Sequence, residues 1–220
     1  MRLRNNIGIS IIILAFICAN AIFLSFYKDV WWDSSVYIGM GKYIFSSGKS
    51  GLWEESRPLI LPLILGIGWK LGFDAVYFGR IVSVIFAILV IIVTYKIGIK
   101  LFSKKIGLLA AFFTAFSYNF LFFSPNILTE IPSAFFVLLA FYFFLNNRFF
   151  LIGLFSGIAV MTRLFHVFTL IGLFLIFFFY FLGKPNFHKK LFYAALGLLI
   201  TIIPYFLLDY YLYNDMLLPF

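Results

Sequence analysis

Long apolar runs separated by short polar segments dominate the chain. A bilayer core about 30 Å thick needs roughly 20 helical residues to cross it, so each run is a candidate membrane span. The runs are 7–27, 75–99, 106–123, 132–145, 149–182 and 191–208. Because the run 149–182 is too long for one span and contains Arg163, we divide it in two. The pattern therefore predicts an all-α membrane protein with about seven transmembrane helices.

The composition agrees with lipid as the main solvent of this chain. Hydrophobic residues make up 64% of it and charged residues only 11%, whereas about a quarter of the residues in soluble domains are charged. A soluble protein of 220 residues has too little interior to bury that much apolar surface. The net charge of +9 does not indicate nucleic acid, because the basic residues are scattered in short loops and form no basic stripe.

The loops fall into one set that holds basic residues and no acid and another set that holds every acid, and this division predicts an orientation. Basic residues mark the N-terminus and every second loop: Arg2, Arg4, Lys100, Lys104, Lys105, Arg148, Lys184, Lys189 and Lys190. The alternate loops hold all eight acids: Asp29, Asp33, Glu54, Glu55, Asp74, Glu130, Asp209 and Asp215. Because Lys and Arg mark cytoplasmic loops, we expect a cytoplasmic N-terminus and an extracytoplasmic acidic face in the plasma membrane. A signal peptide ending near Ala19-Asn20-Ala21 is the alternative at the N-terminus, but the apolar run continues beyond it and favours a retained helix.

The longest loop, 28–74, follows the first span. Long ordered loops in compact proteins are usually functional. The pair Trp31-Trp32 opens this loop as an interfacial anchor, the segment 34–46 predicts a short helix, and 58–71 is apolar enough to lie in the membrane interface. Glu54-Glu55 is expected to be a solvated charge. We therefore expect the loop to rest on the outer leaflet through interfacial helices.

Four motifs follow one another along the chain. They are Trp32-Asp33-Ser34-Ser35-Val36-Tyr37 followed by Gly48, Arg57-Pro58-Leu59-Ile60-Leu61-Pro62, Leu128-Thr129-Glu130-Ile131-Pro132, and Met161-Thr162-Arg163 after Gly153-Leu154-Phe155-Ser156-Gly157. In this order they resemble the GT-C glycosyltransferases, with the protein O-mannosyltransferases and the lipid A aminoarabinose transferases as the nearest group. Two positions depart from that pattern: Ser34 replaces a common acid, and Leu59 replaces the second proline.

The resemblance implies a GT-C fold and transfer of a sugar from a polyprenyl-phosphate-linked donor to an acceptor hydroxyl of a protein, lipid or glycan. Asp33 matches the catalytic base, and Tyr37 matches the tyrosine four residues after it. Arg57 and Arg163 are candidate ligands of the donor phosphate, and Glu130 is a candidate to orient one of them or to assist a metal. A divalent cation, Mg²⁺ or Mn²⁺, stays open as a cofactor, although no His/Cys cluster has metal-ligand spacing. We expect the two carboxylates and the two arginines to converge on one extracytoplasmic cavity.

Each candidate residue also has a structural interpretation. Asp33 precedes two serines and an apolar stretch, which is the pattern of a helix N-cap. Glu130 lies two residues before a proline and could favour a helix N-terminus through the helix dipole. Arg57 and Arg163 could extend to phospholipid headgroups. The sequence leaves these alternatives open.

The sequence is also compatible with two other functions and with a protein that continues beyond residue 220. A transporter or flippase usually carries ionisable residues or broken helices near the middle of the membrane. Here these residues lie at span ends and in one loop, which favours surface chemistry over translocation. An inactive relative that binds a polyprenyl lipid is a third reading. We predict a single membrane domain over 1–220, which could be a minimal form or lack C-terminal parts, since members of the resembled family usually carry further spans.

Overall fold

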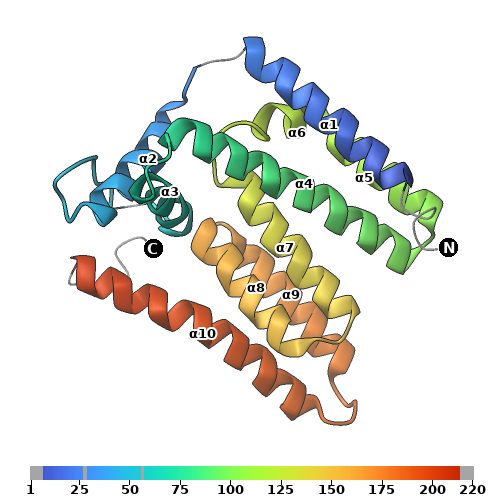
Figure 1. The fold of residues 1–220 in the computed structure, drawn as a ribbon. Helices are drawn as coiled ribbons and strands as arrows, with labels where there is room; N and C mark the ends of the chain where they lie inside the picture. Colours follow the sequence, from blue (N-terminus) through green and yellow to red (C-terminus); the bar gives the residue numbers. More distant parts are fainter. Residues whose placement is uncertain (1–6, 27–28, 56, 214–220) are drawn as a thin grey trace. The chain divides into compact units, whose positions relative to one another are not determined.

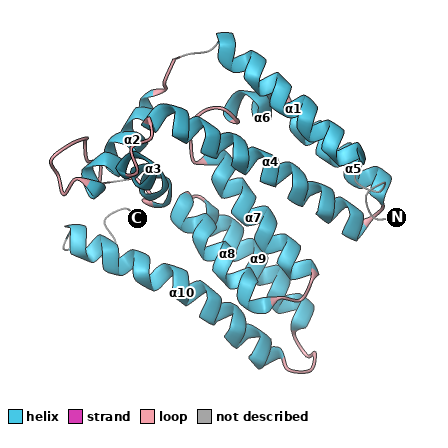
Figure 2. Cartoon of the chain, viewed as in Figure 1, coloured by secondary structure: helices cyan, strands magenta, loops and turns pink. Residues whose placement is uncertain are grey.

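The computed structural model describes residues 7–26, 29–55 and 57–213 (Figure 1). Helices and the loops between them account for all of this part of the chain, and it contains no strand (Figure 2). The helices are α1 (Ile7–Phe26), α2 (Trp32–Phe45), α3 (Ile60–Lys70), α4 (Ala75–Leu101), α5 (Lys104–Phe116), α6 (Tyr118–Phe123), α7 (Glu130–Leu145), α8 (Phe149–Thr162), α9 (His166–Phe181) and α10 (Phe187–Tyr213). The prediction of an all-α membrane protein is confirmed.

Three of the helices are long and apolar enough to cross a membrane, namely α1, α4 and α10. Each contains at least 20 residues and few charges. Four other apolar helices, α3, α7, α8 and α9, are shorter. The predicted spans 106–123, 132–145 and the two halves of 149–182 therefore correspond to helices of no more than 16 residues.

The continuous helix predicted over 106–123 is wrong. Helix α5 begins after Ser103, whose Oγ accepts a hydrogen bond from the Ile106 N–H, and it ends at Phe116. Ser117 then has an extended backbone, with φ −67° and ψ 139°, before the short helix α6. The Ser117 hydroxyl donates to the carbonyl of Thr114. A serine that bonds nearby backbone in this way competes with the helical hydrogen bonds, which accounts for the break.

Contacts between Cα atoms divide the chain into two compact units, each described separately below. Unit 1 comprises Met1–Trp53 and Leu61–Phe135, and unit 2 comprises Glu54–Ile60 and Phe136–Phe220. The single domain expected over 1–220 stays a prediction.

In unit 1 the helices α1, α4 and α5 pack against one another. Helices α4 and α5 approach closely, since a Cβ at Gly98 would lie 2.6 Å from the Cα of Gly107. Phe16 of α1 is fully buried, and Asn20, one turn further on, accepts a hydrogen bond of 2.7 Å from the Ser124 hydroxyl. This buried polar bond joins α1 to the segment that follows α6.

The helices of the first long loop share a second core in unit 1, which we call the loop cluster. Its buried members are Tyr37, Ile38, Leu61, Leu65, Ala75, Ile127 and Leu128. They come from α2, α3, the start of α4 and the segment before α7. The two helices expected in the loop are therefore present, and they pack on the start of α4.

In unit 2 the helices α8 and α10 run side by side (Figure 1). Their contacts join Gly153 to Ala194, Gly157 to Thr201 and Gly197 to Phe150. A Cβ on any of these three glycines would collide with the opposite helix. Gly153 lies against Ala194 and Leu198, whereas Gly157, one turn further on, lies against Leu198 and Thr201, so the helices are parallel. This glycine seam is the small-residue packing that lets membrane helices approach closely, and it explains the Gly-Leu-x-x-Gly motif.

Candidate functional site

Asp33 and Tyr37 lie one turn apart on α2 in unit 1. The residue flanking the helix start is Trp31, with an extended backbone, and Asp33 is the second residue of the helix. Asp33 is therefore not the N-cap, although its charge in the first turn suits the helix dipole. Tyr37 is only 5% exposed and belongs to the loop cluster. Because residues four apart share a helix face, half-buried Asp33 lies on the side of α2 that carries this cluster.

Glu130 begins α7 and follows a buried segment. Ile127 and Leu128 in that segment belong to the same loop cluster as Tyr37. The half-buried Glu130 carboxylate lies in the first turn of α7, and its backbone carbonyl accepts a hydrogen bond from the Ser133 hydroxyl. The loop cluster thus brings the two helix starts that carry Asp33 and Glu130 to one part of unit 1.

Arg57 lies in the non-helical part of unit 2 that precedes α3. Its Nε donates to Glu54 Oε1 at 2.9 Å, and the two side chains are 23% and 36% exposed. Glu54, expected to be a solvated charge, thus pairs with Arg57 and keeps about a third of its side chain exposed. Two residues further on, the backbone N–H of fully buried Leu59 donates to the Tyr205 hydroxyl at 3.2 Å. This bond attaches the arginine segment to α10.

Arg163 separates α8 from α9, as the division of the run 149–182 predicted. Its backbone is extended, with φ −154° and ψ 112°, and its N–H donates to the Ala159 carbonyl at 3.0 Å. Its own carbonyl accepts from the His166 N–H, also at 3.0 Å. The half-buried side chain stands at the C-terminal end of α8, where the helix dipole favours a cation.

The register of the glycine seam relates the two arginines of unit 2 to each other. Gly157 of α8 lies opposite Thr201 of α10. Because the two helices are parallel, the residues four positions after this facing pair, Met161 on α8 and Tyr205 on α10, lie at the same height along the helix axes. Arg163 follows two residues later, and Tyr205 is the residue that holds the Arg57 segment. Both arginines therefore belong to the same end of the α8–α10 pair.

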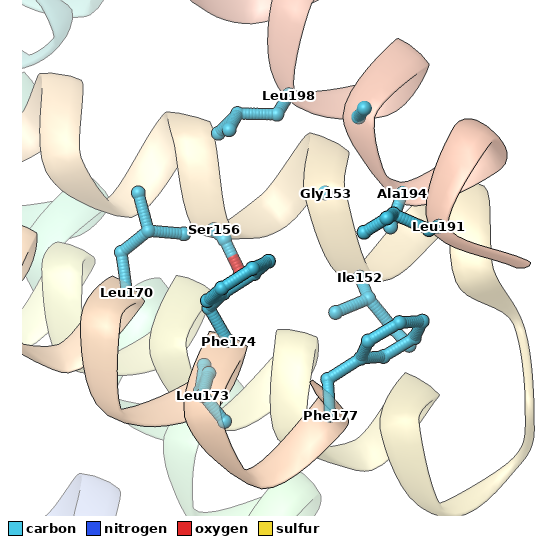
Figure 3. Close-up of a pocket in the computed structure, with 11 residues that line it drawn as sticks. Ile152, Gly153, Ser156, Leu170, Leu173, Phe174, Phe177, Leu191, Ala194 and Leu198 are labelled. Carbon is cyan, nitrogen blue, oxygen red and sulfur yellow. The ribbon is translucent and has the colours of Figure 1, made fainter. Parts of the chain in front are cut away.

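An apolar cavity of about 140 Å³ lies between α8, α9 and α10 (Figure 3). Its walls include Phe174 and Phe177 of α9 and Leu198 of α10. Ser156 of α8 also lines it, and its buried hydroxyl has no hydrogen-bond partner within the part of the chain that the structure describes. Ser156 lies seven residues before Arg163, which is about 10 Å along a helix. Unit 2 thus combines two cations at one end with a hydrocarbon-lined space further along α8.

The carboxylates belong to unit 1 and the arginines to unit 2. Their convergence on one cavity stays a prediction, as do the individual roles of Asp33, Tyr37, Arg57, Glu130 and Arg163. Within residues 7–26, 29–55 and 57–213, no three His, Cys, Asp or Glu side chains gather into a group that could hold a metal ion. A divalent cation beside the carboxylates also stays a prediction.

A family model described as dolichyl-phosphate-mannose-protein mannosyltransferase matches residues 56–207, well over half of the chain. The chain belongs to this family. The resemblance to GT-C glycosyltransferases is thereby confirmed, and the protein is a mannosyltransferase-like membrane glycosyltransferase. No curated protein and no solved structure matches it. The matched segment contains Arg57, Glu130 and Arg163, whereas Asp33 and Tyr37 precede it.

Two contacts near the arginines were not foreseen from the sequence. Tyr205 lies in an apolar run 146 residues away from its partner Leu59, and no local pattern marks such a long-range bond. Glu54 precedes Arg57 by three residues. Residues three apart are neighbours only in a helix or a turn. Because no helix was expected at this position, the spacing alone did not predict the ion pair.

Proposed function

We propose that the protein transfers a sugar from a polyprenyl-phosphate-linked donor to an acceptor hydroxyl on a protein, lipid or glycan. The observation that carries the proposal is the family match over 56–207. The reaction takes place on the extracytoplasmic face of the plasma membrane, which the separation of acidic from basic loops supports.

Arg57 and Arg163 bind the donor phosphate in this proposal. Guanidinium groups make charge-assisted, often bidentate hydrogen bonds to phosphate oxygens, and they stabilise the negative charge that remains as the phosphate leaves. Their location at one end of the α8–α10 pair supports a joint role. The apolar cavity further along α8 offers a surface for the hydrocarbon part of the donor.

Asp33 acts as the general base. The acceptor oxygen forms a bond to the anomeric carbon as the bond from that carbon to the phosphate oxygen breaks. The phosphate leaves with the electron pair, and the acceptor proton passes to the Asp33 carboxylate. Glu130 is an accessory carboxylate, either to orient an arginine or to assist a divalent cation, Mg²⁺ or Mn²⁺. Tyr37 fixes the face of α2 that carries the base. Their shared attachment to the loop cluster supports this grouping.

Transfer from defined donors tests the proposal. The purified full chain, with any separately encoded partner protein, is incubated with polyprenyl phosphates carrying different radiolabelled sugars, and release or transfer of the sugar is measured. We expect activity with at least one donor and a loss of at least tenfold in Arg57→Gln and in Arg163→Gln. Lys42→Gln, a change of one positive charge on α2, serves as the control. Transfer that is equal in all three variants removes the phosphate role.

The orientation is tested by labelling from outside the cell. Cys18 is exposed and is first replaced by Ser. Single cysteines are then introduced at Ser50 and Ser103, which are both exposed. An impermeant maleimide should modify the cysteine at 50 but not the one at 103. The reverse pattern contradicts the proposed orientation and with it the location of the reaction.

A further inference from the structure

A groove of about 720 Å³ lies between α1 and α4 in unit 1. Its wall is mostly aliphatic and includes Ile17 and Leu24 of α1 and Ile81, Ile85 and Ile88 of α4. Both helices are long and apolar enough to cross a membrane, so much of this groove faces hydrocarbon. None of the residues assigned to sugar transfer lines it.

One end of the groove is polar. Half-buried Arg80 lines it and donates from Nη2 to the carbonyl of Asp29 at 3.1 Å. Asp74 lines it as well and caps α4, where its Oδ1 accepts from the N–H groups of Val76 and Tyr77 at 3.0 and 2.9 Å. This polar end therefore presents one cation and one carboxylate.

The length of the groove matches one leaflet of a bilayer. From Val76 to Ile88, α4 rises about 18 Å at 1.5 Å per residue. Half of the hydrocarbon core is about 15 Å thick. The charged pair lies at the start of α4, and the aliphatic wall extends from there along the helix. A lipid with its headgroup at the polar end would thus lay an acyl chain along the groove.

We propose that this groove binds a zwitterionic aminophospholipid, phosphatidylethanolamine, with its phosphate on Arg80 and its ammonium group against Asp74. The volume lies within the range of ligand sites, and both headgroup contacts are charge-assisted. A polyprenyl phosphate would leave the Asp74 carboxylate without a cation. An apolar helix of a partner protein would cover the Asp74 carboxylate with hydrocarbon and offer it no cation, which is costly for a buried charge.

The bond from Arg80 to Asp29 gives the site a connection to the long loop. Asp29 lies four residues before Asp33. A phosphate that fixes the Arg80 guanidinium also fixes the start of the segment that leads into α2. The lipid site does not depend on the transferase chemistry, because binding is measured without a sugar donor.

Native mass spectrometry of the purified full chain tests the site. Phosphatidylethanolamine, phosphatidylglycerol with the same acyl chains, and undecaprenyl phosphate are each added to delipidated protein. We expect one phosphatidylethanolamine to be retained per chain, at least threefold more tightly than either other lipid. Arg80→Gln should weaken retention about tenfold, since one charge-assisted contact is lost. Asp74→Asn, which keeps the cap, should abolish the preference for phosphatidylethanolamine over phosphatidylglycerol.

Lys96→Gln is the matched control, because it removes a positive charge from the far half of the same helix. It should bind phosphatidylethanolamine as the wild type does. Ala21→Phe fills the groove from α1 without changing a charge and should also lose the lipid; it decides the matter if Arg80→Gln does not fold. Unchanged binding in Arg80→Gln or in Ala21→Phe overturns the site. Equal retention of all three lipids by the wild type overturns the headgroup assignment.

Discussion

Asp33 and Glu130 in unit 1 each lie in the first turn of a helix, whereas Arg57 and Arg163 in unit 2 lie outside helices. Each carboxylate owes its place in a first turn to where its own helix begins, and the loop cluster brings the two helix starts together. The arginines depend on contacts between distant segments. The segment of Arg57 is held by the hydrogen bond from Leu59 to Tyr205, which are 146 residues apart. The glycine seam places Arg163 at the same end of the α8–α10 pair. Changes at the glycine seam or at Tyr205 should therefore disturb the phosphate ligands of unit 2 more readily than the carboxylates of unit 1.

The largest effect is expected at the seam itself. In Gly153→Leu the new side chain would collide with the backbone carbonyl of Ala194, which cannot move without shifting α10. Overpacking of this kind costs about 1–3 kcal/mol and sometimes more, so we expect loss of monodisperse protein in size-exclusion chromatography and a lower unfolding temperature. Gly172→Ala in α9 meets nothing within 4 Å and should be neutral or slightly stabilising. Wild-type behaviour of Gly153→Leu would show that the seam is not close-packed.

The next largest effect concerns the carboxylate of unit 1. Asp33→Asn keeps the shape of the side chain but removes its ability to take a proton, so sugar transfer should fall on the order of 10²-fold. Protein yield and donor binding should persist, because Asp33 does not cap α2. Asp29→Asn changes an exposed acid of the same loop and should keep full activity. Full activity in Asp33→Asn would move the role of base to Glu130 or to another residue.

Features set by neighbouring residues could be predicted from the sequence, whereas contacts between distant segments could not. The helices α1 and α4 follow from long apolar runs, the second interrupted only by Arg80 and Lys96, and Arg163 correctly marked the end of α8. The break at Ser117 was missed because one polar residue is tolerated in most apolar helices. The bond from Leu59 to Tyr205 could not be predicted, since a tyrosine in an apolar run looks the same whether or not its hydroxyl has a partner. Whether Asp33 and the arginines meet depends entirely on such distant contacts.

A smaller effect is expected at Tyr205, where the dependence of Arg57 on a distant contact can be measured. Tyr205→Phe leaves the buried Leu59 N–H without its acceptor, which costs about 1–3 kcal/mol of stability. If this bond positions Arg57, the KM for the donor should rise severalfold while kcat changes little. Tyr210→Phe alters a half-exposed tyrosine of the same helix and should change neither constant. A lower kcat with an unchanged KM would show that Tyr205 does not act through donor binding.

The smallest effect tests the ion pair that orients Arg57. Glu54 holds Nε of the guanidinium at 2.9 Å, and both side chains are partly exposed, so the pair should contribute only about 0.2–1 kcal/mol to stability. Glu54→Gln should therefore unfold at nearly the wild-type temperature.

Because a bond at Nε fixes the plane of the Arg57 guanidinium, its loss should raise the KM for the donor about two- to threefold with kcat unchanged. Added salt should raise the KM of the wild type more than that of the variant, because only the wild type has the partly exposed Glu54–Arg57 pair for salt to screen. Glu55→Gln removes the neighbouring exposed charge and should match the wild type in all three measurements. A KM that falls in Glu54→Gln would mean that the carboxylate competes with the donor phosphate for Arg57 and does not orient it.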